Sequence, residues 1–158
     1  MFDIKKIMNN LKSLNNKNAI HAYLSSSTTV TTGSNQYVQV PIDSVLAKKG
    51  TAFSLSGNKI TTNKKMTVKV KAMVDINRES ASSTLSYGLI IEKNSYALTY
   101  QNIQRITNEN YQAITCEAII DLNANDKIYL DLRSVALTNI ATNINSGRCM
   151  TSLIVEEI

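Results

Sequence analysis

Few residues of this chain have the types and the spacing that catalysis needs. The single histidine, His21, falls in a segment of helical pattern, where a packed role is more common than that of a general base. Asp75, Glu79 and Glu92 do not have the spacing of a paired acid and base. An enzyme would require residues far apart in the sequence to converge, so we predict no catalytic residue.

Metal and phosphate sites also lack their usual signals. Asn123, Asn125 and Asp126 lie close together, as calcium ligands do, but a turn between two strands explains the same residues. The five glycines are isolated from one another, so no glycine-rich phosphate loop is present. We expect neither a metal nor another cofactor.

Two cysteines, Cys116 and Cys149, are too few for a disulfide framework. Cys116 falls on the apolar side of an alternating segment, which predicts a small buried side chain. We expect Cys116 to be reduced, with a bridge to Cys149 as the less favoured alternative.

The composition is that of an ordinary globular chain with a basic balance. Of the 158 residues, 43% are hydrophobic and 18% are charged, and the formal net charge is +5. This length allows one domain with its own core and a short appendage. The lysines are scattered and not interleaved with stacking aromatics, so no nucleic-acid partner is predicted. No segment has transmembrane length and no signal peptide is recognisable, so we expect cytoplasmic synthesis without membrane insertion.

The elements that must position any site are strands. Residues 113–122 and 128–133 alternate between apolar and polar side chains, with Ile119 as the one apolar exception on the polar face. Such alternation puts successive side chains on opposite faces of a sheet. With 123–126 as the turn, this stretch predicts a long antiparallel hairpin with one buried and one wet face.

Further strands are expected along most of the chain. Residues 66–74 alternate with Lys69 and Lys71 pointing outward, and the apolar segment 149–155 is expected to lie centrally in a sheet. We place the other strands at 37–40, 53–56, 59–62, 85–92 and 96–100. We place connections at 45–50, at 101–110 (a loop or a short strand) and at 135–147. Around eight to ten short strands predict an all-β sandwich or jelly roll over residues 35–158.

The N-terminal segment has a different period. Its apolar residues recur at the three-four-three spacing of a coiled-coil seam, formed by Ile4, Ile7, Leu11 and Leu14. Asn18 continues this seam as a polar position. We expect residues 1–24 to form a short helix, which is too short to be stable alone and must associate, dock on a partner or lie on its own domain. The Ser/Thr-rich residues 25–34 then indicate a linker.

Five segments resemble the C1q/TNF-like jelly-roll family in their order and pattern. They are Ala-Phe-Ser-Leu-Ser-Gly-Asn-Lys-Ile at 52–60, the long strand at 66–75, Tyr-Gly-Leu-Ile-Ile-Glu-Lys-Asn-Ser at 87–95, Ile-Asp-Leu-Asn-Ala-Asn-Asp-Lys-Ile-Tyr-Leu at 120–130 and Thr-Ser-Leu-Ile-Val at 151–155. Asn125 stands where the family has the glycine of Gly-Asp, and Lys65-Met66 replaces its Gly-x-Tyr. The resemblance covers about residues 34–158 and implies a jelly roll that associates around a three-fold axis.

The expected helix, the Asn-, Thr- and Ser-rich β-domain and the lack of a signal peptide together resemble bacteriophage head-fibre, decoration and tail-fibre proteins. This resemblance implies a virion protein, a homotrimer whose helix anchors it to capsid, neck or tail proteins and whose jelly-roll head projects. The alternative is a receptor-binding or adhesin module that recognises a host cell-surface glycan. An enzyme such as a glycan depolymerase ranks last, because no paired carboxylates are present.

Overall fold

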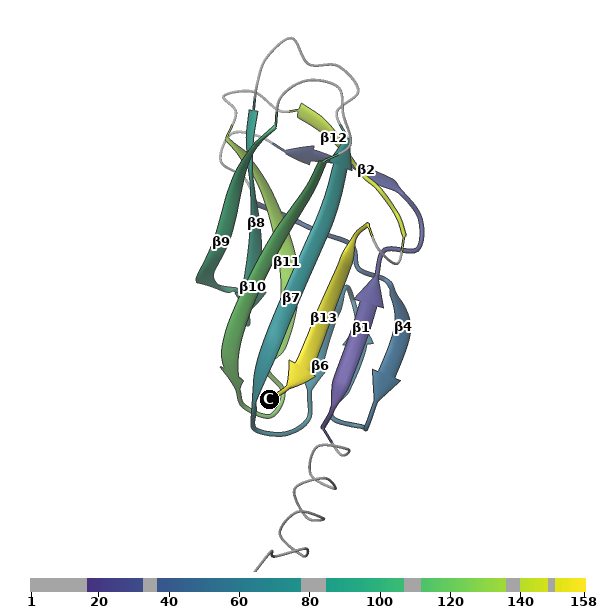
Figure 1. Cartoon of the computed structure of the whole chain (residues 1–158), viewed down its shortest axis with the longest axis vertical. Helices are drawn as coiled ribbons and strands as arrows, with labels where there is room; N and C mark the ends of the chain where they lie inside the picture. The colour runs from purple at the N-terminus through teal and green to yellow at the C-terminus, as the bar shows by residue number, and fades with distance from the viewer. Residues whose placement is uncertain (1–16, 33–36, 78–84, 107–111, 136–139, 148–149) are drawn as a thin grey trace, which may run out of the picture.

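The computed structural model describes residues 17–32, 37–77, 85–106, 112–135, 140–147 and 150–158, which form two antiparallel sheets (Figure 1). The front sheet, nearest the viewer in Figure 1, consists of β1 (Ala19–Tyr23), β2 (Thr28–Thr32), β4 (Ser44–Lys49), β7 (Met66–Asn77), β10 (Gln112–Leu122), β12 (Ile140–Ile144) and β13 (Ser152–Glu157). The back sheet consists of β3 (Tyr37–Gln39), β5 (Phe53–Ser56), β6 (Lys59–Thr62), β8 (Leu85–Lys93), β9 (Tyr96–Ile106) and β11 (Lys127–Val135). The predicted all-β sandwich is therefore confirmed. Within the described ranges no helix is long and apolar enough to cross a membrane.

The long strand β7 organises the front sheet. β10 pairs along one edge of β7, and β13, β1 and β4 extend the sheet in that order from the other edge. The far end of β7 pairs with β12, which pairs with β2. The back sheet has the order β5-β6-β11-β8-β9, and β3 also pairs with β11. β13 thus lies inside the front sheet, as its apolar sequence predicts.

The hydrophobic core fills the space between the two sheets. Residues along β10 alternate between exposed and buried, so that Ile114 and Leu122 join the core while Glu117 faces solvent. Phe53 and Tyr87 are the largest of the fully buried side chains. Full burial of an aliphatic side chain contributes about 1.5–3 kcal/mol of transfer free energy, so the alternating strands supply most of the driving force.

A chain of hydroxyl groups joins the two sheets inside the core. The Tyr87 hydroxyl lies 3.0 Å from Thr142 Oγ1, which lies 2.9 Å from Thr32 Oγ1. All three residues are fully buried. Because each hydroxyl both donates and accepts, the chain offsets the cost of removing these groups from water.

The turn at 123–126 crosses between the sheets and does not close a hairpin. β10 pairs with β7 in the front sheet, whereas β11 pairs with β6, β8 and β3 in the back sheet. Asn125 adopts a φ of 71°, as expected where the C1q/TNF-like family has glycine, and its N–H donates to the Thr62 carbonyl at 2.7 Å. The hairpin prediction is wrong because alternation fixes which face of a strand is buried, but not which strand pairs with it.

Two segments that were expected to be connections contain the strands β4 and β12. In the segment that was expected to be a loop or a short strand, β9 continues to Ile106. β4 is an edge strand, and five of its six side chains are exposed. A strand whose two faces are both exposed to solvent shows no alternation of apolar and polar residues. Its sequence therefore resembles that of a loop.

The prediction of a helix over residues 1–24 is wrong at its C-terminal end. Ala19–Tyr23 is the strand β1, which pairs with β13 on one side and β4 on the other. The predicted linker is also wrong over Thr28–Thr32, which forms β2. Five residues are too few to separate a helical from a strand period, and pairing on both edges overrides local propensity. Outside the described residues lie the predicted seam positions Ile4, Ile7, Leu11 and Leu14.

Candidate functional site

Asn18 fixes the N-terminal end of the described chain to the base of the sandwich. Its backbone N–H and its side-chain Nδ2 both donate to Glu157 Oε2, at 2.9 and 2.6 Å. Its Oδ1 accepts from the backbone N–H of Ala52 at 3.1 Å, and a Cβ at Gly50 would overlap that oxygen. The two bonds from Asn18 hold the pKa of the Glu157 carboxyl below its usual range. Asn18 is 8% exposed and is bonded to the β-domain. Its predicted place in a helical seam is therefore wrong.

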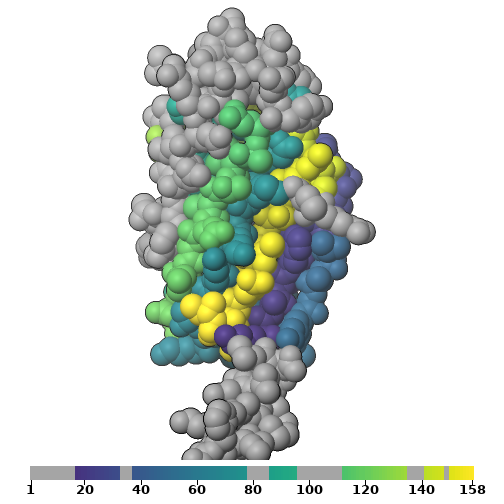
Figure 2. All heavy atoms as spheres, in the orientation of Figure 1, coloured from purple at the N-terminus to yellow at the C-terminus, as the bar shows by residue number. Residues whose placement is uncertain are grey.

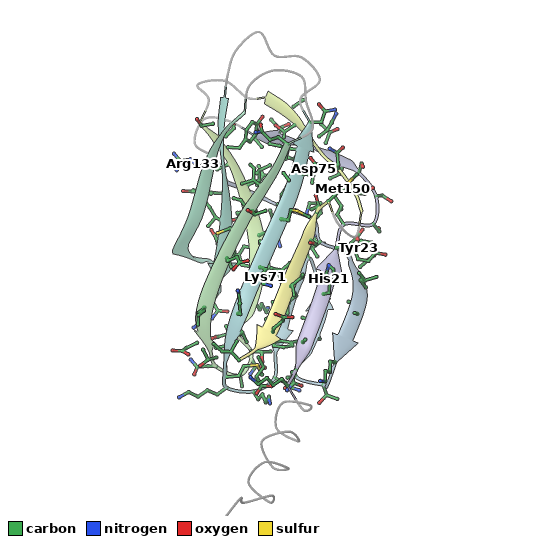
Figure 3. All side chains as sticks on the ribbon, in the orientation of Figure 1. His21, Tyr23, Lys71, Asp75, Arg133 and Met150 are labelled. Atoms are coloured by element: carbon green, nitrogen blue, oxygen red, sulfur yellow. The ribbon has the colours of Figure 1, made fainter. Side chains whose placement is uncertain are left out.

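Five strands lie side by side on the outer face of the front sheet (Figure 2), and backbone pairing aligns their side chains in rows. In one row, the backbone pairing aligns Ala47, His21, Ile154, Lys71 and Glu117. In the row nearer Asn18, it aligns Lys49, Ala19, Glu156, Lys69 and Ile119. We call the outward side chains of these two rows the front face. Figure 3 shows His21 on β1 and Lys71 on β7 within it.

Ile119 is the exposed apolar side chain of the front face. It is the apolar exception in the sequence pattern, and its side chain points outward and is 59% exposed. Glu117 and Asp121 flank it on the same face of β10. Glu117 pairs with Lys69 at 3.0 Å, and Asp121 accepts a hydrogen bond from Thr67 at 2.6 Å. Ile119 is therefore the apolar centre of an otherwise polar part of the front face.

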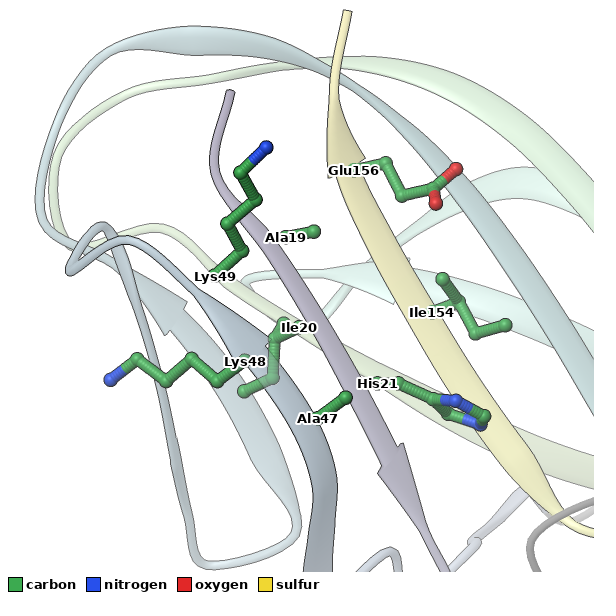
Figure 4. Close-up of a pocket in the computed structure, with 8 residues that line it drawn as sticks. All are labelled: Ala19, Ile20, His21, Ala47, Lys48, Lys49, Ile154 and Glu156. Carbon is green, nitrogen blue, oxygen red and sulfur yellow. The ribbon is translucent and has the colours of Figure 1, made fainter. Parts of the chain in front are cut away.

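A shallow hollow opens on the front face over β1 (Figure 4). Its volume is about 280 Å³, and the small side chains of Ala19 and Ala47 leave the space. Further residues that line the hollow are Ile154, His21, Lys48, Lys49 and Glu156. The His21 imidazole extends from β1 toward β13, and its buried Nε2 has no hydrogen-bond partner. The structure thus gives His21 a partly packed position, as the sequence predicts.

The carboxylates considered in the sequence do not come together. Glu79 lies outside the described residues, Asp75 lies on β7 in the front sheet, and Glu92 lies on β8 in the back sheet. Asp75 is 8% exposed, and burial raises the pKa of its carboxyl, an effect that the neighbouring Asn145 side chain partly offsets. Asp75 and Glu92 thus belong to different sheets and are not the paired acid and base of an active site.

A different pair, Glu92 and Asp131, meets on the outer side of the back sheet. The Tyr129 hydroxyl donates to Glu92 Oε2 at 2.6 Å, and Lys59 Nζ lies 4.3 Å from the centre of the Tyr129 ring. Burial, followed by the charge of Glu92, raises the pKa of Asp131 to about 7. The sequence does not reveal this pair, because strand pairing alone brings β8 and β11 together. Glu92 and Asp131 are only 7% and 8% exposed, so both carboxyls are largely shielded from solvent.

The turn at 123–126 is held by bonds from Asp126 to the turn's own backbone and to the side chains of residues 93 and 94. Asp126 Oδ2 accepts from the Asn123 N–H at 2.8 Å and pairs with Lys93 at 3.0 Å, while Oδ1 accepts from Asn94 at 2.6 Å. Burial opposes ionisation of Asp126, but these bonds prevail and hold the pKa of its carboxyl below the usual range. Among the residues that the structure describes, no three His, Cys, Asp or Glu side chains are grouped to hold a metal.

Cys116 is buried on the core side of β10, as predicted. Cys149 lies outside the described residues. At the end of the sandwich opposite Asn18, where Figure 1 shows β2 and β12, a polar hollow of about 290 Å³ is lined by Ser27, Thr28, Thr29, Asn143 and Asn145.

No protein-family model and no curated protein matches this chain. Solved structures do match it. A crystal structure of murine APRIL at pH 5.0 has a TM-score of 0.66 at 11% identity, over 90% of this chain and 99% of that one. Murine APRIL at pH 8.0 gives 0.60 at 11% identity, with the same coverage of both chains. The Eiger TNF structure from S. frugiperda gives 0.58 at 12% identity, over 90% of this chain and 91% of that one. The chain therefore has a TNF-like jelly-roll fold, which its sequence resemblance implied.

Proposed function

We propose that this chain is a non-enzymatic, trimer-forming structural domain of a bacteriophage particle, attached through its N-terminal residues. The observation that carries the proposal is the front face on a TNF-like fold. Exposed Ile119 and the hollow beside Ile154 form a surface that association would cover. The C1q/TNF-like resemblance supplies the three-fold symmetry, which closes when each copy contacts the next in the same way.

The attachment part of the proposal is supported by the place where the chain enters the head. Asn18 lies beside Glu157 at the base of the sandwich, and the polar hollow lies at the opposite end. An anchor built from the seam Ile4, Ile7, Leu11 and Leu14 would therefore leave the hollow facing away from the mount. Burial of each seam side chain would contribute about 1.5–3 kcal/mol before entropy costs.

Light scattering tests the trimer. The purified chain has a mass of 17.4 kDa, and we expect a particle of about three times that mass. A monomer at micromolar concentration would contradict the proposal, since the front face would then remain in water.

Substitutions in the predicted seam test the anchor. Ile7→Asp and Leu11→Asp should leave a folded, trimeric head that no longer incorporates into particles, because a charge in the seam disfavours its burial. Asn9→Asp, which lies off the seam, is the matched control and should incorporate normally. Normal incorporation of all three variants would place the anchor within the β-domain instead.

A second candidate is a receptor-binding module for a host cell-surface glycan, and the polar hollow at the far end favours it. Hydroxyl and amide groups from Ser27, Thr28 and Asn143 line that hollow, and such groups both donate to and accept from sugar hydroxyls. A glycan array would test this function. Binding that is lost in Asn143→Ala and retained in Asn63→Ala, at the opposite end, would support it.

A further inference from the structure

We propose that the base of the sandwich, the end at which Asn18 lies, docks on an acidic protein surface of the mount, the particle protein that receives residues 1–16. The inference rests on the proposed attachment through the N-terminal residues and gives the chemistry of the surface that receives them. Strand pairing and turn contacts bring six segments together at the base, which is the lower end in Figure 1. They are residues 17–19, 49–52, 62–69, 93–95, 119–127 and 156–158.

The base carries all of the excess positive charge of the described residues. It contains seven lysines and four carboxylates, whereas the other described ranges contain five lysines and arginines against five carboxylates. The lysines of the base are Lys17, Lys49, Lys64, Lys65, Lys69, Lys93 and Lys127. The charge of a surface steers the partner that approaches it and suppresses partners of like charge. A protein that docks on the base should therefore present acidic side chains.

Two carboxylates of the base are already held by lysines of the base. Lys64 Nζ lies 3.2 Å from Glu157 Oε1, and Lys93 Nζ lies 3.0 Å from Asp126 Oδ2. Glu157 also accepts from the Asn18 side chain at 2.6 Å. These contacts satisfy the acids within the fold, so they compete little for the remaining lysines.

Several other lysines of the base have no such partner. Lys65 and Lys127 are exposed, and no carboxylate among the described residues pairs with either of them or with Lys17 and Lys49. Glu156, an exposed carboxylate of the base, offsets only part of this charge. The unpaired ammonium groups can each donate up to three hydrogen bonds to carboxylates of another protein.

Two hollows give acidic side chains room beside these lysines. One has a volume of about 390 Å³ and is lined by Lys65, and the other has a volume of about 330 Å³ and is lined by Lys17 and Lys49. Asp121 lines the first hollow and Glu156 the second. This mixture of charges suits carboxylates that are set singly on a protein surface. It suits the evenly spaced phosphates of a nucleic acid less well, because some of them would meet an acidic side chain.

The course of the chain brings the base and the mount together. Residues 1–16 join the base at Lys17, and their sequence contains three lysines and one carboxylate. A protein that receives this segment therefore lies next to the base and meets lysines in excess on both. An acidic surface would be attracted to both parts of the chain.

A labelled decaglutamate peptide, followed by fluorescence anisotropy with the full chain at low salt, tests the surface. Lys65→Gln/Lys127→Gln should weaken binding about 2- to 30-fold, the range expected for the loss of two exposed ion pairs. The matched control, Lys59→Gln/Lys71→Gln, removes the same charge from β6 and β7 outside the base and should bind like the parent chain. Thermal melts establish that both variants are folded.

Three results would overturn the assignment. Unchanged binding in Lys65→Gln/Lys127→Gln would exclude the base as the site. Equal weakening in Lys59→Gln/Lys71→Gln would show a response to net charge alone. Tighter binding of a single-stranded DNA oligonucleotide or of phosphatidylserine vesicles than of decaglutamate would exclude an acidic protein as the partner.

Incorporation into particles separates this inference from the seam anchor. Lys65→Glu/Lys127→Glu should keep the mass of the parent assembly in light scattering and lose incorporation, because the reversed charges repel an acidic mount. Normal incorporation of this variant, with loss in Ile7→Asp, would overturn docking through the base and leave the seam anchor standing. The opposite result would overturn the seam anchor and support the base.

Discussion

Asp131 places a carboxyl group beside Glu92, where burial and the charge of Glu92 raise its pKa from 3.8 to about 7. The folded state therefore binds this proton more tightly than the unfolded chain does. The stability that the proton confers is fully present below pH 3.8 and is lost as the pH rises through about 7. Asp131 is thus a site at which a rise in pH from about 4 to about 7 weakens the back sheet.

Asp131→Asn should flatten this dependence, because an amide has nearly the same shape and no proton to lose in this pH range. We expect the variant to exceed the parent protein in unfolding free energy at pH 8 by on the order of 1–3 kcal/mol after allowance for solvent screening, with convergence near pH 4. Urea unfolding at several pH values measures this difference. Glu156→Gln, at an exposed carboxylate, is the control and should follow the parent curve. Parallel curves for Asp131→Asn and the parent would show that Asp131 does not titrate in this range.

Asn18→Ala should destabilise the head although Asn18 lies at the edge of the described chain. The change leaves the Ala52 N–H without its acceptor in a buried position, and removes the amide that donates to Glu157. An unsatisfied buried donor costs about 1–3 kcal/mol. Asn63→Ala, which removes an exposed amide donor to the Thr51 carbonyl, should cost less. Equal losses in urea unfolding would mean that Asn18 is no more than a surface residue.

At the scale of elements, β1 is the first strand of the β-domain, and we expect the fold to require it. Removal of residues 1–16 leaves every described strand in place, whereas removal of residues 1–24 takes away β1 and exposes the edges of β13 and β4. We expect the first truncation to unfold cooperatively near the parent melting temperature and the second to lack folded structure. Circular dichroism with thermal melting distinguishes them. A folded chain without residues 1–24 would show that the two sheets form without β1.

Strand faces could be predicted from the sequence, and strand partners could not. The alternation in β7 and β10 identifies Val68, Val70 and Ile114 as buried, because one face of each strand packs against the core. The same alternation fits a hairpin or a crossing between sheets equally well. β1 is ambiguous because it is short, and β4 is hidden because its side chains are exposed on both faces.

At the scale of the whole molecule, the jelly roll follows from the number and spacing of strands, but the candidate site does not. Ile119 is visible in the sequence as an apolar residue out of pattern. The hollow over β1 is not visible, because Ala19, Ala47 and Ile154 become neighbours only when β4, β1 and β13 pair. A surface made from three distant segments leaves no local signal in the sequence.

The same pairing predicts that the chain fails to fold without its last strand. β13 buries Leu153 and Val155 completely and joins β1 to β7. A chain that stops at Thr151 should therefore lack protease resistance and a cooperative melt, whereas loss of the exposed Ile158 alone should cost little. A protease-resistant chain ending at Thr151 would show that β1 can reach β7 without β13.

The central place of β13 also sets the timing of assembly during translation. β1 can pair with β4 soon after both leave the ribosome, but its other edge stays open until β13 emerges about 130 residues later. An open strand edge is a site at which nascent chains on the same message can pair wrongly. Each head is thus completed only after its ribosome has read the whole domain. A message that is cut short before β13 should therefore yield no folded β-domain.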